Sequence, residues 1–229
     1  KLPATSKWFH STPGSKGYHE LIASYLSPYA STPVPLELTR LSPTGTITAF
    51  ERFEAPLSVL LSHITDPPDP SIRLYLAQCP LEDLPADLRA DVPMPDLLRQ
   101  LGKGDIYGSS VWIGRPPTMT PLHRDPNPNL FVQLAGRKVL RLMRPGVGRE
   151  VYLRAREGRG HANMRGEEMM AGEENRRLEK AVWGDVGGDV EGYEAVVESG
   201  DGLYIPLGWW HSVRGIGEGV NGSVNWWFR

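Results

Sequence analysis

The chain has 229 residues, 40% of them hydrophobic, which is enough for one sizeable buried core. Its formal net charge of -2 gives no overall attraction to nucleic acid, so such a partner is unsupported, although a local basic patch would still permit one. Cys79 is the only cysteine, which excludes an internal disulfide and a thiolate zinc knuckle. No apolar run approaches the roughly eighteen residues of a membrane-spanning helix. We therefore expect an intracellular protein, cytoplasmic or nuclear, with no membrane partner.

The first part of the chain, residues 1–105, is rich in proline and mixes short helical and extended patterns. Residues 18–25 are predicted to form a short helix, and residues 56–64 another, because proline is tolerated in a first helical turn. Alternating apolar residues at 72–77 predict a strand. These features indicate a helical and extended flank that packs on the core of a single domain, residues 1–229.

From residue 106 to residue 229 the sequence consists of short apolar runs separated by glycine and proline, which is typical of a β-sandwich or barrel. The strands around Gly136 are predicted to pair as a hairpin with glycine in its turn. A polar, charge-dense insertion is expected at residues 155–193, with a helix at 167–182 that is either solvated or a lid over the substrate. The predicted strands of this β core are residues 111–114, 130–134, 138–142, 202–206 and 223–228.

His123 and Asp125 stand two residues apart, so on a strand both side chains project to the same face and can enter a barrel. Pro126 and Pro128 cannot donate ladder hydrogen bonds, which predicts that the strand ends there, at the barrel mouth. His211 follows a strand and an aromatic turn that could return its imidazole across the barrel. Two histidines and one carboxylate form the metal-binding face of non-haem Fe(II) oxygenases. Taken singly, these residues would also suit a structural hydrogen-bonded pair and a histidine packed among aromatic rings.

Lys138 begins a predicted strand on which its same-face neighbours, Leu140 and Leu142, are apolar. An ammonium group that faces inwards at this position needs an anion to compensate its charge. The alternative is a surface lysine at the end of the predicted hairpin.

Two segments, residues 111–144 and 201–228, resemble the JmjC branch of the cupin-fold, 2-oxoglutarate-dependent oxygenases, and within it the small hydroxylase-type members. Together they cover roughly a quarter to a third of the chain. The order and spacing of the motifs make their combination more specific than any one of them. The matching motifs are Thr-Pro-Leu-His-Arg-Asp at 120–125, Asn-Leu-Phe-Val-Gln at 129–133, Gly-Arg-Lys at 136–138, Gly-Leu-Tyr-Ile-Pro at 202–206, Trp-Trp-His at 209–211 and Ser-Val-Asn-Trp-Trp at 223–227.

The resemblance implies a mainly β fold with flanking helices, built on a double-stranded β-helix (jelly-roll, cupin) core of JmjC type. It implies that His123, Asp125 and His211 bind Fe(II). It also implies that Lys138 holds the distal carboxylate of 2-oxoglutarate and that the hydroxyl of Thr120 shares this carboxylate.

Three further residues are matched to the family's co-substrate site. Asn129 and Asn225 are expected near 2-oxoglutarate and the open metal position, where amides can orient a carboxylate or an oxygen ligand. Tyr107 is expected to supply a phenol to 2-oxoglutarate, as an upstream tyrosine does in relatives.

The implied activity is Fe(II)- and 2-oxoglutarate-dependent hydroxylation of a C–H bond, in which O2 is consumed and succinate and CO2 are released. We expect a protein side chain as substrate, because the chain lacks the cysteine-rich zinc segments that accompany many histone demethylases. N-methyl demethylation and hydroxylation of a tRNA base use the same site and stay open. A cupin-like metal- or ligand-binding interaction module is the non-enzymatic alternative, and a metal hydrolase would need a general base that the sequence does not offer. The oligomeric state is not predicted.

Overall fold

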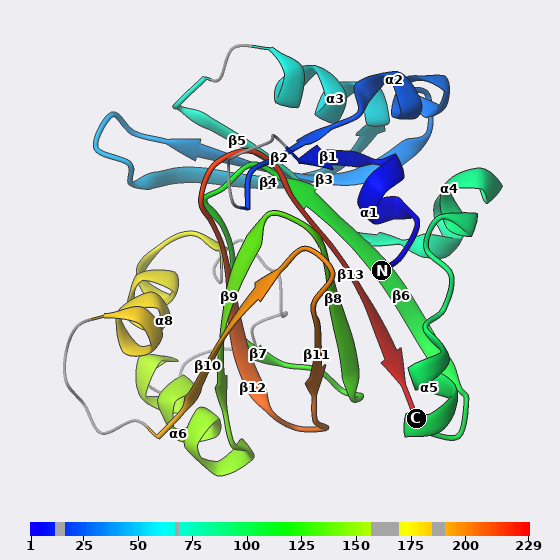
Figure 1. The fold of residues 1–229 in the computed structure, drawn as a ribbon. Helices are drawn as coiled ribbons and strands as arrows, with labels where there is room; N and C mark the ends of the chain where they lie inside the picture. Colours follow the sequence, from blue (N-terminus) through cyan, green and yellow to red (C-terminus); the bar gives the residue numbers. More distant parts are fainter. Residues whose placement is uncertain (12–16, 67–68, 157–169, 185–190) are drawn as a thin grey trace.

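The computed structural model describes residues 1–11, 17–66, 69–156, 170–184 and 191–229. In these residues a four-stranded sheet and a seven-stranded sheet enclose the core, and all their strand pairings are antiparallel (Figure 1). The predicted mainly β fold with a jelly-roll type core is therefore confirmed. The four-stranded sheet has the order β10-β9-β12-β7, formed by β7 (Thr118–Arg124), β9 (Arg137–Met143), β10 (Tyr193–Glu198) and β12 (Trp210–Ile216).

The seven-stranded sheet combines strands of the barrel with strands of the N-terminal flank. Its order is β11-β8-β13-β6-β5-β3-β4, so that β5 of the flank pairs with β6 of the core. The flank therefore extends one face of the barrel. The members of this sheet are β3 (Pro33–Leu41), β4 (Ile47–Pro56), β5 (Ile72–Pro80), β6 (Ile106–Gly114), β8 (Asn129–Ala135), β11 (Gly202–Ile205) and β13 (Asn221–Phe228).

The predicted hairpin around Gly136 is wrong, because β8 and β9 lie in different sheets. β8 pairs with β11 and β13, whereas β9 pairs with β10 and β12. Gly136 forms the corner between the sheets with φ of +69°, and a Cβ there would lie 2.8 Å from the side chain of Asn221. A glycine turn between two apolar runs looks the same in the sequence whether the chain folds back or crosses over.

The N-terminal flank contains short helices beside a small sheet of β1 (Phe9–Ser11) and β2 (His19–Leu21). The helix predicted at 18–25 is wrong over its first half, since residues 19–21 pair with β1 and only Ala23–Leu26 are helical. The predicted helix after Pro56 and the strand at 72–77 are confirmed. The helical segments are α1 (Ala4–Lys7), α2 (Ala23–Leu26), α3 (Leu57–Thr65), α4 (Ala86–Ala90) and α5 (Asp96–Leu101), with 3-10 turns at Ser27–Tyr29 and Leu81–Asp83.

Asp91 links the first residues of the chain to the rest of the N-terminal flank. Its carboxylate accepts hydrogen bonds from the Trp8 indole at 2.9 Å, the Tyr25 hydroxyl at 2.7 Å and the Lys7 ammonium at 2.6 Å. Burial opposes the ionisation of Asp91, but these three donors outweigh it and hold the pKa of the carboxyl below its ordinary value. All four residues belong to the N-terminal flank, so the cluster serves as a structural tie within it.

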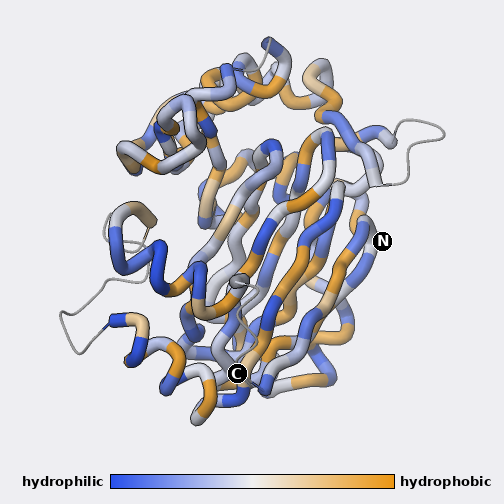
Figure 2. Tube along the Cα trace, turned by 90° about the vertical axis from the view of Figure 1, so that its left-hand side faces the viewer, coloured by the Kyte–Doolittle hydropathy of each residue, from blue (hydrophilic) through white to orange (hydrophobic). Residues whose placement is uncertain are grey.

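Two longer helices, α6 (Pro145–Arg156) and α8 (Glu173–Trp183), lie beside the four-stranded sheet (Figure 1). Leu178 and Val182 of α8 pack in one buried cluster with Leu122 of β7 and Trp210 of β12. The helix predicted at 167–182 is confirmed over residues 173–182, which belong to α8, whereas residues 171 and 172 are bends. Residues 157–169 and 185–190 of the predicted insertion lie outside the described residues. Hydrophobic and hydrophilic residues are interspersed along the strands (Figure 2). Among the described residues, no helix is long and apolar enough to cross a membrane.

Candidate metal and co-substrate site

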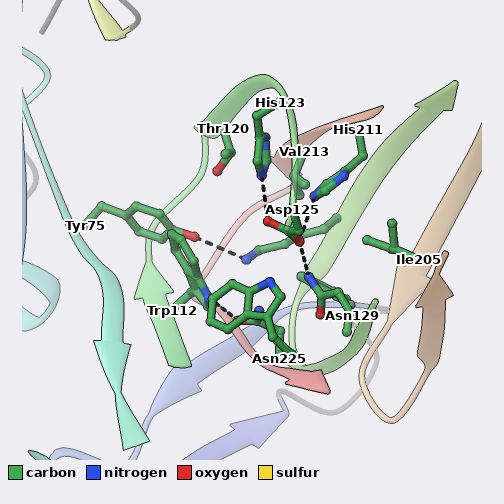
Figure 3. Close-up of a pocket in the computed structure, with 13 residues that line it drawn as sticks. Tyr75, Trp112, Thr120, His123, Asp125, Asn129, Ile205, His211, Val213 and Asn225 are labelled. Atoms are coloured by element: carbon green, nitrogen blue, oxygen red, sulfur yellow. Dashed lines mark hydrogen bonds and ion pairs between the residues drawn. The ribbon is translucent and has the colours of Figure 1, made fainter. Parts of the chain in front are cut away.

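The two histidines are brought together by the pairing of β7 with β12. His123 and His211 are direct cross-strand partners, and their ring centroids are 4.2 Å apart. Asp125 follows the last residue of β7, as expected from the prolines after it, and its carboxylate oxygens lie 3.8 Å from His123 Nε2 and 3.6 Å from His211 Nε2 (Figure 3). One ligand atom from each of the three residues therefore falls within 4.8 Å of the others.

Neighbouring groups orient all three side chains. The Nδ1 atoms of His123 and His211 face the backbone carbonyls two residues earlier, at 2.8 and 3.4 Å, which leaves each Nε2 directed towards Asp125. The Asn129 amide donates to Asp125 Oδ2 at 2.9 Å. Burial lowers the pKa of His211, against the opposing effects of the Asp125 carboxylate and the Trp209 carbonyl, so the imidazole is neutral and its lone pair can bind a metal. The donor set and its orientation fit Fe(II).

Lys138 lies in the same cavity and points inwards, as its apolar neighbours predicted. It is 2% exposed, and its ammonium donates to Ser223 Oγ at 2.7 Å and to Tyr75 Oη at 3.2 Å. The ammonium also lies 5.4 Å from the ring centroid of Phe131. A buried cation flanked by two hydroxyls fits the carboxylate of a small organic acid.

A single cavity connects these groups and encloses about 410 Å³ of empty space, including its open mouth. Seven of the eight site residues predicted from the sequence line it: Thr120, His123, Asp125, Asn129, Lys138, His211 and Asn225. The remaining walls are aromatic and aliphatic, which limits the access of water to the polar groups. These walls are formed by Tyr75, Trp112, Phe131, Ile205, Val213 and Trp227.

Tyr107 is the predicted residue that the structure places elsewhere. Its side chain is 52% exposed and contacts Arg229, whose guanidinium carbon lies 5.5 Å from the ring centroid. Tyr75 supplies the phenol of the cavity instead, because β5 pairs with β6 and places Tyr75 opposite Gly114, where a Cβ would lie 2.6 Å from the Tyr75 ring. The strand containing Tyr75 was predicted, but its neighbour in the sheet was not.

The amides of Asn129 and Asn225 have different orientations. Asn225 Oδ1 accepts a hydrogen bond from the Trp112 indole at 2.7 Å, so its NH2 group can donate to a ligand. Asn129 uses its NH2 group on Asp125, and its Oδ1 is buried with no hydrogen-bond partner among the described residues. Asn225 can therefore donate to a carboxylate, whereas Asn129 can accept from a ligand.

The chain is similar to known proteins over most of its length. Residues 4–229 match the model of the cupin-like domain family. Lysine-specific demethylase JMJ30 of Arabidopsis thaliana is 31% identical over 163 residues, which are 71% of this chain and 35% of the relative. Lysine-specific demethylase 8 of Danio rerio is 34% identical over 156 residues, 67% of this chain and 36% of the relative. Jumonji C domain-containing protein 5 of Drosophila melanogaster is 30% identical over 159 residues, 68% of this chain and 36% of the relative.

The matched segments therefore span about a third of the length of these curated relatives. The chain belongs to the cupin-like domain family, in its JmjC branch of 2-oxoglutarate-dependent oxygenases. Members of this class use Fe(II) and 2-oxoglutarate, which are the cofactor and co-substrate expected from the sequence.

Proposed function

We propose that this protein hydroxylates a C–H bond of a protein or peptide substrate in a reaction that depends on Fe(II) and 2-oxoglutarate. The observation that carries the proposal is the joint presence, in one cavity, of the His123, Asp125 and His211 ligand atoms and the buried Lys138 ammonium. A structural metal site would not need a buried cation in the same pocket. We also propose an intracellular location, in the cytoplasm or nucleus, because Cys79 is the only cysteine and no internal disulfide can form.

His123, Asp125 and His211 would hold iron through three ligands on one side and leave the other side for co-substrate and O2. Iron and 2-oxoglutarate, when bound, would supply an oxidation by O2 in which one oxygen atom enters the succinate formed as 2-oxoglutarate loses CO2 and the other enters a C–H bond of the substrate. The protein keeps the ligands oriented through the carbonyls behind each imidazole and through Asn129 behind Asp125. The aromatic walls exclude water and direct one bond of the substrate to the metal.

Lys138 would bind the distal carboxylate of 2-oxoglutarate. Tyr75 and Ser223 accept hydrogen bonds from its ammonium, so each hydroxyl can direct its own proton to the same carboxylate. Thr120 also lines the cavity and offers a further hydroxyl. The NH2 group of Asn225 would donate to the co-substrate, at an oxygen atom that lies nearer the metal than the distal carboxylate does. Asn129, by contrast, orients the metal ligand Asp125.

Removal of a methyl group from lysine is the second candidate. Two relatives are named lysine-specific demethylases, and hydroxylation of an N-methyl carbon uses the same metal and co-substrate groups. The two reactions differ only in which carbon lies beside the metal. Hydroxylation adds one oxygen to the substrate, whereas demethylation releases formaldehyde and shortens the substrate by one methyl group.

Anaerobic visible absorbance tests the proposal. Wild-type protein with Fe(II) is expected to gain a charge-transfer band when 2-oxoglutarate is added, and Asp125→Ala is expected to lose it. Tyr107→Phe is the control, because this side chain lies outside the cavity. If folded wild-type protein, freed of other metals and then supplied with Fe(II) and 2-oxoglutarate, shows no band, the proposal is refuted. Mass spectrometry of methylated and unmethylated peptides incubated with the aerobic protein then separates hydroxylation from demethylation.

A further inference from the structure

The pairing of β7 with β12 contains an irregularity inside the proposed site. His211 is opposite His123 and Val213 is opposite Thr120. Two steps along β12 therefore correspond to three steps along β7, so β7 contains one extra residue, which is a β-bulge.

This bulge allows both Thr120 and His123 to face the cavity. Residues three apart on a regular strand project to opposite faces, yet both side chains line the same pocket. Pro121 lies within the bulge, and its carbonyl oxygen is the atom 2.8 Å from His123 Nδ1. The local backbone thus brings the Thr120 hydroxyl into the site and orients the imidazole of His123.

Ser212 holds the bulge from the outer side of the sheet. It is 1% exposed, and its hydroxyl donates to the Thr120 carbonyl at 2.9 Å. The Trp183 indole, at the end of α8, donates to the same Ser212 oxygen at 2.9 Å. A chain of two hydrogen bonds therefore runs from α8 to the backbone of β7. Neither Ser212 nor Trp183 is among the residues that line the cavity.

Trp183 is itself held in place by α8 and the sheet. The guanidinium carbons of Arg141 on β9 and Arg214 on β12 lie 4.6 and 4.3 Å from its ring centroid. Arg141 also donates to the carbonyl of Val182 at 2.6 Å, which ties the end of α8 to β9. The indole N–H is therefore directed at Ser212 by several contacts.

We propose that Trp183 and Ser212 are positioning residues that hold the β7 bulge and thereby set His123 for the metal and Thr120 for 2-oxoglutarate. The inference rests on the proposed function and deepens it, because it makes the site depend on the docking of α8. Loss of either hydrogen bond should loosen the bulge and weaken the binding of metal and co-substrate together. Loss of both should cost little more than loss of one, because the two bonds act in series.

Trp183→Phe removes the hydrogen bond to Ser212, Ser212→Ala removes both hydrogen bonds, and Ser212→Thr keeps the hydroxyl. The readouts are Co(II) affinity, the Co(II) d–d absorption band and 2-oxoglutarate affinity, all measured without turnover. We expect Trp183→Phe and Ser212→Ala to bind Co(II) about three- to tenfold more weakly than wild type, a smaller loss than when a residue hydrogen-bonded directly to a metal ligand is replaced. The d–d band should shift, and 2-oxoglutarate should bind more weakly. Ser212→Thr should bind like wild type.

Trp8→Phe is the matched control, since it also removes a buried indole hydrogen bond, here to Asp91. It should lower the unfolding temperature and leave Co(II) affinity and the band unchanged. The inference is overturned if Trp183→Phe and Ser212→Ala bind as wild type does, or if Trp8→Phe weakens Co(II) equally at the same loss of stability. Wild type that binds neither Co(II) nor Fe(II) with 2-oxoglutarate would refute the proposed function itself, and the inference with it.

Discussion

Replacing Lys138 by methionine removes the buried ammonium while keeping a side chain of similar length. In the wild type this ammonium is 2% exposed and lies beside the hydroxyls of Tyr75 and Ser223, so a carboxylate bound there meets a desolvated cation. A hydrogen bond to a charged group contributes about 1.5 to 3 kcal/mol. We therefore expect the dissociation constant of 2-oxoglutarate to rise about 10- to 150-fold.

The assay is anaerobic calorimetric titration of 2-oxoglutarate into Lys138→Met protein loaded with Fe(II). Arg137→Met is the matched control, because it removes a neighbouring positive charge whose side chain is 41% exposed and pairs with Glu198 at the surface. The control should change affinity less than about twofold, since exposed charges are screened by solvent and salt. Unchanged affinity in Lys138→Met, or an equal loss in both variants, would contradict the assignment of Lys138 as the carboxylate anchor.

Three more predictions concern the metal ligand Asp125, the cavity phenol of Tyr75 and the Asp91 cluster of the flank. Asp125→Ala removes a metal ligand, so turnover coupled to succinate formation should fall below detection while circular dichroism stays native; retained turnover would exclude this metal site. Tyr75→Phe should weaken 2-oxoglutarate about two- to tenfold, whereas Tyr107→Phe should not, and the reverse order would restore Tyr107 to the site. Asp91→Ala leaves the buried Trp8 indole without an acceptor and should lower the unfolding free energy by about 1 to 3 kcal/mol near neutral pH. Because the folded pKa of Asp91 is below its ordinary value, this wild-type advantage should persist down to about pH 4 and disappear at lower pH in urea unfolding, and a constant difference would disprove the linkage.

Much of the site could be predicted because its signals are local. The spacing of His123 and Asp125 on a strand, the prolines that end this strand and the apolar neighbours of Lys138 all lie within short segments. Resemblance to a family then supplied His211, Thr120 and the asparagines. The structure brings these residues into one cavity, although their chemical roles stay predictions until ligand binding is measured.

Other features could not be predicted, because they depend on which strands become neighbours. Tyr107 and Tyr75 both lie on strands, and only the pairing of β5 with β6 decides which phenol reaches Lys138. The turn at Gly136 has the same local sequence pattern for a hairpin as for a corner between two sheets.

The sequence by itself therefore predicted the types of metal ligand and most of the core strands, since these depend on side-chain chemistry and short-range periodicity, and its motifs carried the resemblance to the family. Only the tertiary structure decided which tyrosine contacts Lys138 and where the chain crosses between the sheets at Gly136. It also decided the bulge that turns Thr120 and His123 to one face. The contact between Trp183 and Ser212 joins residues 29 positions apart on different elements, and packing of α8 against the sheet creates it. Such contacts leave no periodic pattern in the chain, because their partners are chosen by the packing of the whole domain.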